Sequence, residues 1–186
     1  SRMNGGERFG QERMQSWITK NLENYPYLHN DLASDRTSRL SPYLHFGCIS
    51  PLEVAALSKD AEEESFVRQV CWRDFFLQVL NSRPDSAKQD YRPRNFKWIS
   101  NANQYKAWEE GRTGYPLVDA GMRQLLNEGF MHNRARMVTA SFFTKNLHMD
   151  WRLGAKHFMD HLIDGDVASN QLNWQWVAGP AVTALI

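Results

Sequence analysis

Apolar residues recur at helical spacing along most of the chain. From Glu7 to Leu22 they fall mostly on one helical face, and Pro26 stops the run. Residues 62–82 predict a longer helix that closes before Pro84. Its inward-facing positions are Phe66, Val67, Val70, Cys71, Phe75 and Val79.

Capping residues and prolines predict the other helices. Ser41-Pro42 and Ser50-Pro51 each place an N-cap serine before a proline, and Glu53 completes a capping box with Ser50. Asn101 can cap a helix that ends at Gly111. We expect further helices over 115–129, 132–147 and 151–163, and one more between the 164–166 turn and about 179.

No stretch of four to eight residues alternates with period two between turn signals, so the sequence predicts no β-sheet. Residues 83–100, rich in Pro, Arg and Asn, are expected to form a loop. The fold class is therefore all-α, with one helical domain over 7–179. Residues 1–6 are interpreted as a linker or cloning remnant, and 180–186 as a tail.

Composition narrows the class of protein. A chain of 186 residues is the size of one domain. Its formal net charge of +1 gives no overall positive potential that would indicate binding to nucleic acid or to a membrane surface. Two cysteines, Cys48 and Cys71, are too few for a disulfide framework and favour a reducing, cytoplasmic setting. The uncharged stretch 167–186 carries four Asn or Gln residues, which argues against a membrane span.

Tryptophan is the unusual residue, with seven in the chain. Trp174 and Trp176 lie about 200° apart on a helix, so one can face a core while the other faces a cleft. An exposed tryptophan in a cleft is a stacking platform for bases.

Two polar clusters could bind anions. Thr37–Ser41 combines three hydroxyls with a guanidinium and suits an anion cradle, although plain capping by Ser41 is equally compatible. Helix 132–147 has no acid but carries Arg134, Arg136 and Lys145. Taken alone, that helix is better interpreted as a solvated basic face.

Three other groups carry weaker signals. Arg73 lies among apolar residues and requires a carboxylate or phosphate partner, of which Asp74 is the simplest. His157 and His161 have spacing that can hold a metal, but without a third ligand we interpret them as helix-surface histidines and predict no metal. Asp164, Asp166 and Asn170 are too few for a calcium loop and better suit hydrogen bonds to a heteroaromatic ring or sugar.

Seven motifs occur together in one order. They are Thr37-Ser-Arg-Leu-Ser41, Cys71-Trp-Arg-Asp-Phe75, Gly114-Tyr-Pro-Leu-Val-Asp-Ala120, His132-Asn-Arg-Ala-Arg-Met137, Asp150-Trp-Arg152, Asp164-Gly-Asp-Val-Ala-Ser-Asn170 and Trp174-Gln-Trp176. From about Gly5 to Gly179 the chain resembles the FAD-binding helical domain of the photolyase/cryptochrome family. Among its branches, the chain is most similar to the class I cyclobutane pyrimidine dimer photolyases.

The resemblance implies an all-helical domain that binds FAD in a bent conformation below a cavity for a flipped-out pyrimidine dimer. In the family, light excites reduced flavin, an electron passes to the dimer, the cyclobutane ring splits and the electron returns. Extrusion is least costly for a damaged base. The implied enzyme is a carbon-carbon lyase acting on DNA.

The resemblance also assigns residues to the cofactor. The phosphates would be held by the first motif, with Tyr25 nearby, and the isoalloxazine and ribityl groups by residues from later motifs, with Asn170 facing flavin N5. The full FAD set is Tyr25, Thr37, Ser38, Arg39, Leu40, Ser41, Arg73, Asn133, Arg136, Asp164, Asp166 and Asn170.

Electron transfer and lesion binding draw on other residues. Trp174, Trp151 and Trp98 match the family's chain of tryptophans that relays an electron to the flavin. The lesion set implied by the resemblance is Gln69, Trp72, Asn133, Arg134, Met137 and Trp176. The residue types at Asn133 and Met137 are similar to those of the cyclobutane-dimer enzymes at the same positions. This similarity disfavours repair of (6-4) photoproducts.

Three departures from the family pattern matter. Gln69 replaces a glutamate that assists the dimer radical anion, so repair should be weaker or slower. The match lacks the N-terminal antenna domain, which could be a separate chain. After Gly179 the family's DNA-gripping segment is replaced by 180–186, so we expect truncation at both ends and weaker DNA binding.

The sequence leaves three functions open. They are a light-dependent DNA photolyase, a cryptochrome-like flavin photoreceptor without repair activity, and a truncated FAD- or DNA-binding remnant. Without FAD, Arg73, Asp164 and Asp166 should lack partners, so FAD is expected to stabilise the fold.

Overall fold

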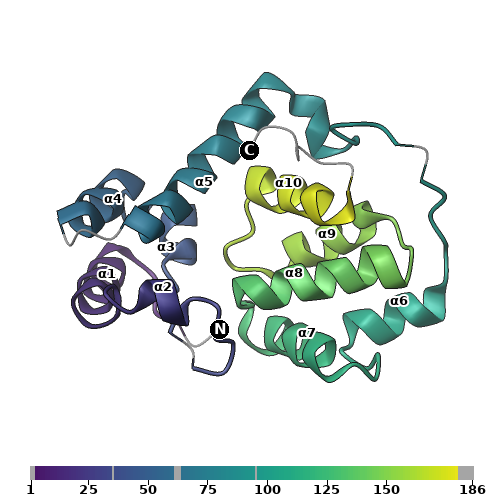
Figure 1. Cartoon of the computed structure of the whole chain (residues 1–186), viewed down its shortest axis with the longest axis horizontal. Coiled ribbons are helices and arrows are strands. Elements are labelled where there is room, and N and C mark those ends of the chain that lie inside the picture. The colour runs from purple at the N-terminus through teal and green to yellow at the C-terminus, as the bar shows by residue number, and fades with distance from the viewer. Residues whose placement is uncertain (1–2, 35, 61–63, 95, 180–186) are drawn as a thin grey trace. The chain divides into compact units, whose positions relative to one another are not determined.

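The computed structural model describes residues 3–34, 36–60, 64–94 and 96–179. These residues form helices and connecting loops, with no strand among them, which confirms the predicted all-α class (Figure 1). The chain divides into two compact units, and the boundary falls between Phe75 and Phe76. That boundary lies inside helix α5 (Glu64–Ser82).

The first unit holds the N-terminal helices. They are α1 (Glu7–Asn21), α2 (Tyr25–Leu28), α3 (Ser41–His45), α4 (Pro51–Asp60) and the first part of α5. Met14 and Trp17 of α1, Tyr43 of α3 and Val54 of α4 lie in its buried core. The side chain of Met3 packs against the same core, and the Tyr43 hydroxyl donates to the Asn4 carbonyl at 2.7 Å.

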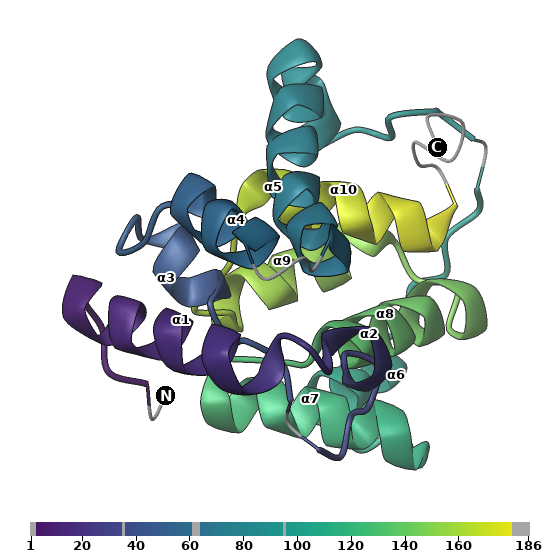
Figure 2. The same ribbon diagram turned by 60° about the vertical axis from the view of Figure 1, so that its left-hand side comes forward.

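The second unit holds the rest of the helices. They are η1 (Pro84–Ala87), α6 (Ala102–Glu109), α7 (Pro116–Glu128), α8 (Asn133–Ser141), the π-helical turn η2 (Phe142–Asn146), α9 (Trp151–His161) and α10 (Val167–Ala178). Helix α10 packs against α8, α9 and η1, and α7 packs against α8 (Figures 1 and 2). This arrangement makes α10 the central element of the unit.

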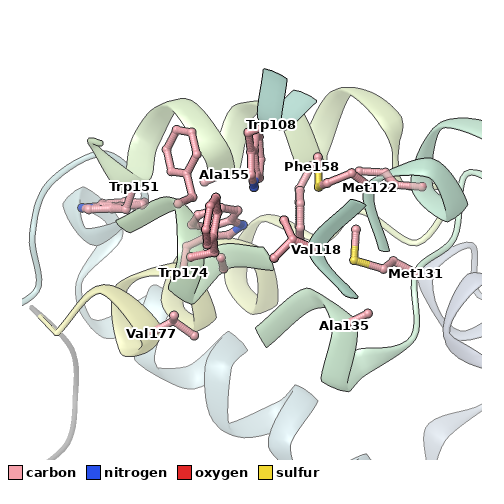
Figure 3. Close-up of a cluster of buried hydrophobic side chains, with 14 of the residues drawn as sticks. Trp108, Val118, Met122, Met131, Ala135, Trp151, Ala155, Phe158, Trp174 and Val177 are labelled. Carbon is pink, nitrogen blue, oxygen red and sulfur yellow. The ribbon is translucent and has the colours of Figure 1, made fainter. Parts of the chain in front are cut away.

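Aromatic side chains dominate the core of the second unit (Figure 3). Trp174 meets Phe143, Phe158 and Trp108 edge-on, with ring centroids 5.9, 5.0 and 6.1 Å apart. Gly154 of α9 lies directly under the Trp174 ring, and a Cβ at this position would overlap it. The glycine therefore allows α9 and α10 to approach closely enough to enclose the indole.

Most helix positions agree with the sequence prediction. Asn101 caps α6, its side chain accepting from the amides of Asn103 and Gln104, and Gly129 ends α7 in the left-handed conformation with φ 66°. Three details differ. The short helix α2, which contains Pro26, was not predicted. Residues 84–87 form a 3₁₀ helix inside the expected loop, and the helix expected over 132–147 changes to π-helical pairing at Phe142.

Several side-chain predictions are wrong, and three of them concern helix caps and helix faces. Ser41 is the first residue of α3 and makes no side-chain cap, because the helix begins one residue earlier than the N-cap pattern implies. Cys71, expected to face inward, is exposed on α5. His157, expected on the helix surface, is buried, because Trp108 meets its ring edge-on and His161 lies tilted against it, with ring centroids 5.3 and 4.3 Å apart.

Some predictions fall outside the described residues. These are the start of the helix expected from residue 62, the first two residues of the expected linker, and the tail 180–186. Among the helices that are described, none is both long and apolar enough to cross a bilayer.

Candidate functional site

The loop Thr37–Ser41 of the first unit is held by helix α1 through its backbone carbonyls. Arg13 donates from Nε to the Ser38 carbonyl at 2.8 Å and from Nη2 to the Thr37 carbonyl at 3.3 Å. Trp17 donates from Nε1 to the Arg36 carbonyl at 3.2 Å. Because a trans peptide directs its C=O and N–H to opposite sides, the amides that follow these carbonyls point away from α1.

The side chains of this loop suit an anion. Thr37 Oγ1 is buried and has no hydrogen-bond partner among the described groups. Ser38 Oγ accepts from the Leu40 amide at 3.3 Å, and Arg39 has a φ of 53°, the left-handed conformation found in anion-binding backbone nests. With capping by Ser41 excluded, the anion cradle is the interpretation that the loop supports.

Tyr25 is connected to this loop through Trp17, which contacts both of them. Its ring is buried, stacks on His29 with centroids 4.9 Å apart and meets Trp17 edge-on at 5.8 Å. Trp17 in turn binds the Arg36 carbonyl. Two parts of the predicted phosphate set are thus brought together within the first unit.

Helix α5 carries three predicted residues on its surface. Gln69 is exposed, and Trp72 is half-buried with its ring edge-on to Phe75 at 5.3 Å. Arg73 lies 3.7 Å from the Asp74 carboxylate, and both side chains are partly exposed. Asp74 is thus the partner of Arg73, as the simplest interpretation of the sequence predicts, and the expectation that Arg73 lacks a partner without FAD is wrong.

In the second unit Arg136 and Asp164 form an ion pair. Arg136 Nη2 lies 3.0 and 2.9 Å from the two carboxylate oxygens, and its Nε donates to the Met131 carbonyl at 2.8 Å. The Asp164 side chain is only 3% exposed. The expectation that Asp164 lacks a partner is therefore wrong, since Arg136 compensates the buried charge.

Asp166 and Asn170 mark the start of α10. Asp166 is the N-cap and accepts from the Ser169 amide at 2.8 Å, so it too has a partner, contrary to expectation. Asn170 donates from Nδ2 to the Ala155 carbonyl of α9 at 2.9 Å, which fixes the orientation of its amide. Asp164, Asp166 and Asn170 thus lie within the segment 164–170, which covers the turn before α10 and the first turn of that helix.

The predicted lesion residues of α8 are neighbours at its first turns. Asn133 is exposed, and Arg134 Nη1 lies 3.3 Å from Met137 Sδ. His132 caps the helix, with Nδ1 accepting from the Arg134 amide at 3.1 Å. Trp176 of α10 is 41% exposed while Trp174 is buried, as predicted for two indoles on opposite helix faces.

The three relay tryptophans belong to one hydrophobic cluster. Trp174 and Trp151 are buried in it (Figure 3). Trp98 packs against the cluster and lies tilted against Phe96, with ring centroids 5.2 Å apart. Their accessibility increases from Trp151 and Trp174 to the half-buried Trp98. The structure therefore brings together three residues separated by up to 76 positions.

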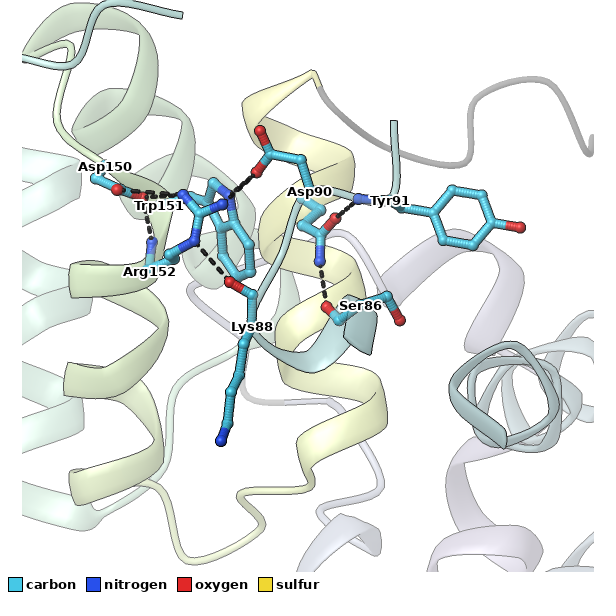
Figure 4. A network of polar contacts seen from close by, with 8 residues as sticks. Ser86, Lys88, Asp90, Tyr91, Asp150, Trp151 and Arg152 are labelled. Carbon is cyan, nitrogen blue, oxygen red and sulfur yellow. Dashed lines mark hydrogen bonds and ion pairs between the residues drawn. The ribbon is translucent and has the colours of Figure 1, made fainter. Parts of the chain in front are cut away.

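A polar network beside Trp151 was not found by sequence reasoning (Figure 4). Trp151 Nε1 donates to Asp90 Oδ1 at 2.8 Å, and Arg152 Nη2 donates to the same oxygen at 2.9 Å. Gln175, fully buried on α10, donates to the Ser86 carbonyl and accepts from the Tyr91 amide, both at 2.7 Å. The one sequence signal for Asp90 is an acid within a loop otherwise rich in Lys and Arg.

Among the described residues, His157 has a pKa that its surroundings shift strongly. Burial and the adjacent His161 lower the pKa of His157 to about 4, so the ring is neutral at physiological pH. Within the described residues, no group of three potential ligands could hold a metal ion.

Comparison with known proteins identifies the family to which the chain belongs. Residues 66–185 match the family model described as the FAD binding domain of DNA photolyase. The chain is 57% identical over 94% of its length to a deoxyribodipyrimidine photo-lyase of Streptomyces griseus, and 41% identical over 97% to one of Alkalihalophilus pseudofirmus. It belongs to the family of photolyase FAD-binding domains.

Solved structures agree in fold. A bacterial class III photolyase from Agrobacterium tumefaciens superimposes with a TM-score of 0.94 at 39% identity, covering 98% of this chain and 40% of that one. A Synechocystis cryptochrome gives 0.91 at 36% identity, covering 97% and 40%. The chain spans 39% of the length of the two curated relatives named above.

Proposed function

We propose that the chain binds FAD through the polar groups of the Thr37–Ser41 loop and of the segment 164–170. The buried, unpartnered Thr37 hydroxyl and the outward amides of its loop have the chemistry that a pyrophosphate requires. The fixed carboxylates and amide of the segment 164–170 suit the hydroxyls and ring N–H groups of a flavin nucleotide. The residues present therefore fit the cofactor.

Each residue has a definite task in this proposal. Tyr25, Thr37, Ser38, Arg39, Leu40 and Ser41 hold the phosphates, while Arg73, Asn133, Arg136, Asp164, Asp166 and Asn170 hold the flavin and ribityl groups. The ion pair with Arg136 holds the Asp164 side chain in place. FAD, when bound, supplies light absorption and one-electron transfer.

We further propose that the holoprotein is a deoxyribodipyrimidine photolyase that splits cyclobutane pyrimidine dimers in DNA. The observation that carries this proposal is the 57% identity to the Streptomyces griseus enzyme over nearly the whole chain. Trp72, Trp176, Asn133, Arg134, Met137 and Gln69 would contact the extruded lesion, with the exposed Trp176 ring as a stacking surface. Trp98, Trp151 and Trp174 would relay electrons from the surface.

The test has two stages. The purified chain, mixed with FAD and freed of excess, should retain flavin absorbance, and Thr37→Val with Ser38→Ala should lose it. With reduced flavin and an oligonucleotide containing one thymine dimer, blue light should restore intact thymines while a dark sample should not. Trp176→Ala should bind flavin normally but repair poorly, whereas equal repair in light and dark would refute the proposal.

A second candidate is a cryptochrome-like photoreceptor without repair activity. The likeness to the Synechocystis cryptochrome supports it, as does the tryptophan cluster, which serves flavin photoreduction without any DNA. A holoprotein that is photoreduced by blue light but leaves the dimer intact would favour this function. A chain that retains no flavin would instead be a remnant of the family domain.

Partners and setting follow from the same proposal. The substrate is DNA that contains pyrimidine dimers, and a separate chain could supply the antenna chromophore. Cysteine usage, with Cys48 and Cys71 both as free thiols, favours a reducing, cytoplasmic setting. Membership of class I remains a prediction from the motifs, since the Agrobacterium structure named above is of class III.

A further inference from the structure

Trp151 has a different partner from the other buried tryptophans of its core. Its indole has one polar hydrogen, and that hydrogen is donated to the Asp90 carboxylate at 2.8 Å (Figure 4). Trp108 donates to a neutral acceptor, the Thr139 carbonyl, at 3.1 Å. Trp174 Nε1 is buried with no hydrogen-bond partner among the described groups.

The Asp90 carboxylate is held in place from several directions. Arg152 donates from Nη2 to Asp90 Oδ1 at 2.9 Å and from Nε to the Lys88 carbonyl at 2.8 Å. Gln175 binds the same segment on both sides, at Ser86 and Tyr91. The loop that carries Asp90 is therefore anchored to α9 and α10, and the carboxylate keeps its position against the indole.

Three formally charged groups lie beside Trp151, and one of them, the Arg152 guanidinium, lies over its ring with Cζ 4.9 Å from the centroid. Asp90 and Asp150 each carry one negative charge and Arg152 one positive charge, which leaves a net charge of −1. The Asp90 side chain is only 12% exposed, so water screens its charge weakly. Among the described residues no carboxylate binds Trp174 Nε1. The Asp90 carboxylate therefore stabilises a positive charge on Trp151 in a way that Trp174 lacks, and it offsets the Arg152 guanidinium beside the same ring.

We propose that Asp90 is a positioning residue that makes electron transfer from Trp151 to Trp174 favourable; this inference rests on the proposed function. When a bound, photoexcited oxidised flavin has taken one electron from Trp174, one electron would pass from Trp151 to the oxidised Trp174. Trp151 is then a radical cation whose N–H proton stays hydrogen-bonded to Asp90 Oδ1. An electron from Trp98 restores Trp151 and moves the positive charge to the surface.

A first measurement needs no flavin. In protein carrying ¹⁵N-labelled indoles, the Trp151 N–H resonance should lie downfield and exchange slowly with solvent. Asp90→Asn keeps an oxygen acceptor and should retain most of this protection, whereas Asp90→Ala should lose it. Asp85→Asn, which removes an exposed carboxylate from the same segment, is the matched control and should leave the resonance unchanged.

The second measurement follows light-driven reduction of bound oxidised flavin by transient absorption. In Asp90→Asn the Trp151 to Trp174 step should slow about tenfold, which corresponds to about 1.4 kcal/mol, while Asp85→Asn matches wild type. If the Trp151 to Trp174 step has the same rate in wild type and in Asp90→Asn, this inference is wrong while the proposed function stands. A flavin-loaded wild type that is not photoreduced at all would refute the relay and this inference with it.

Discussion

At the scale of single residues, Gln69 places a neutral side chain in the proposed lesion site. Gln69 is exposed on α5 and presents a neutral amide where the family's dimer-splitting enzymes place a carboxyl group. Gln69→Glu should raise the light-driven repair yield severalfold, because a charged or protonated carboxyl makes a stronger hydrogen bond to the base. The measurement is dimers repaired per photon absorbed by holoprotein of equal flavin content. An unchanged yield would show that the amide is no handicap.

His157 makes a separate prediction about pH. Its pKa of about 4 lies below the ordinary value of 6.5, so the unfolded chain binds a proton first as pH falls. The stability contributed by the neutral ring is complete above pH 6.5 and is lost progressively towards pH 4. His157→Phe removes this loss without removing a hydrogen bond, since Nε2 has no partner among the described groups.

The effect of His157→Phe is measured by urea unfolding at pH 7 and pH 4.5. Between these values the free energy of unfolding should fall by about 2 kcal/mol more in wild type than in the variant. A parallel fall in both proteins would mean that His157 is protonated in the folded state at pH 4.5. Carboxylates contribute to both curves alike and cancel in the difference.

At the level of elements, the contact between α9 and α10 depends on a glycine. Alanine in place of an exposed helical glycine stabilises by about 1 kcal/mol, but Gly154 lies against the Trp174 ring. Gly154→Ala should therefore destabilise the chain by about 1–3 kcal/mol and shift the Trp174 fluorescence. Thermal unfolding checks the sign, and a more stable variant would show that α9 and α10 can separate at no cost.

Helices were the most predictable elements, because their signals are local. Asn101 and Gly129 mark a start and an end through chemistry that acts within one turn. The π-helical turn at Phe142 has no such local signal, and it packs against both α9 and α10. Burial of His157 was missed for the same reason, because Trp108 reaches it from another helix.

The candidate site was predictable only in part. Its motif residues were identified by resemblance, while the pairing of Asp164 with Arg136 and of Trp151 with Asp90 joins residues 28 and 61 positions apart. Sequence spacing cannot reveal such pairs without the fold. Asp90 in particular lies in a loop that periodicity leaves undefined.

For the whole molecule, ligand binding and stability are linked. A cofactor that binds only the folded chain stabilises it by about 2.7 kcal/mol at a concentration one hundred times its dissociation constant. FAD should therefore raise the melting temperature by roughly 5–10 °C in a chain of this size. Riboflavin, which lacks phosphates, should raise it less, and a melting temperature unmoved by FAD would contradict the proposed binding.

The most direct measurement is an action spectrum for dimer repair by the chain carrying reduced FAD. If the bound flavin is the source of the electron, the repair rate at each wavelength should follow the flavin's own absorption, with none in the dark. Repair that is independent of wavelength, or a flavin-loaded chain that leaves dimers intact at every wavelength, would contradict the account.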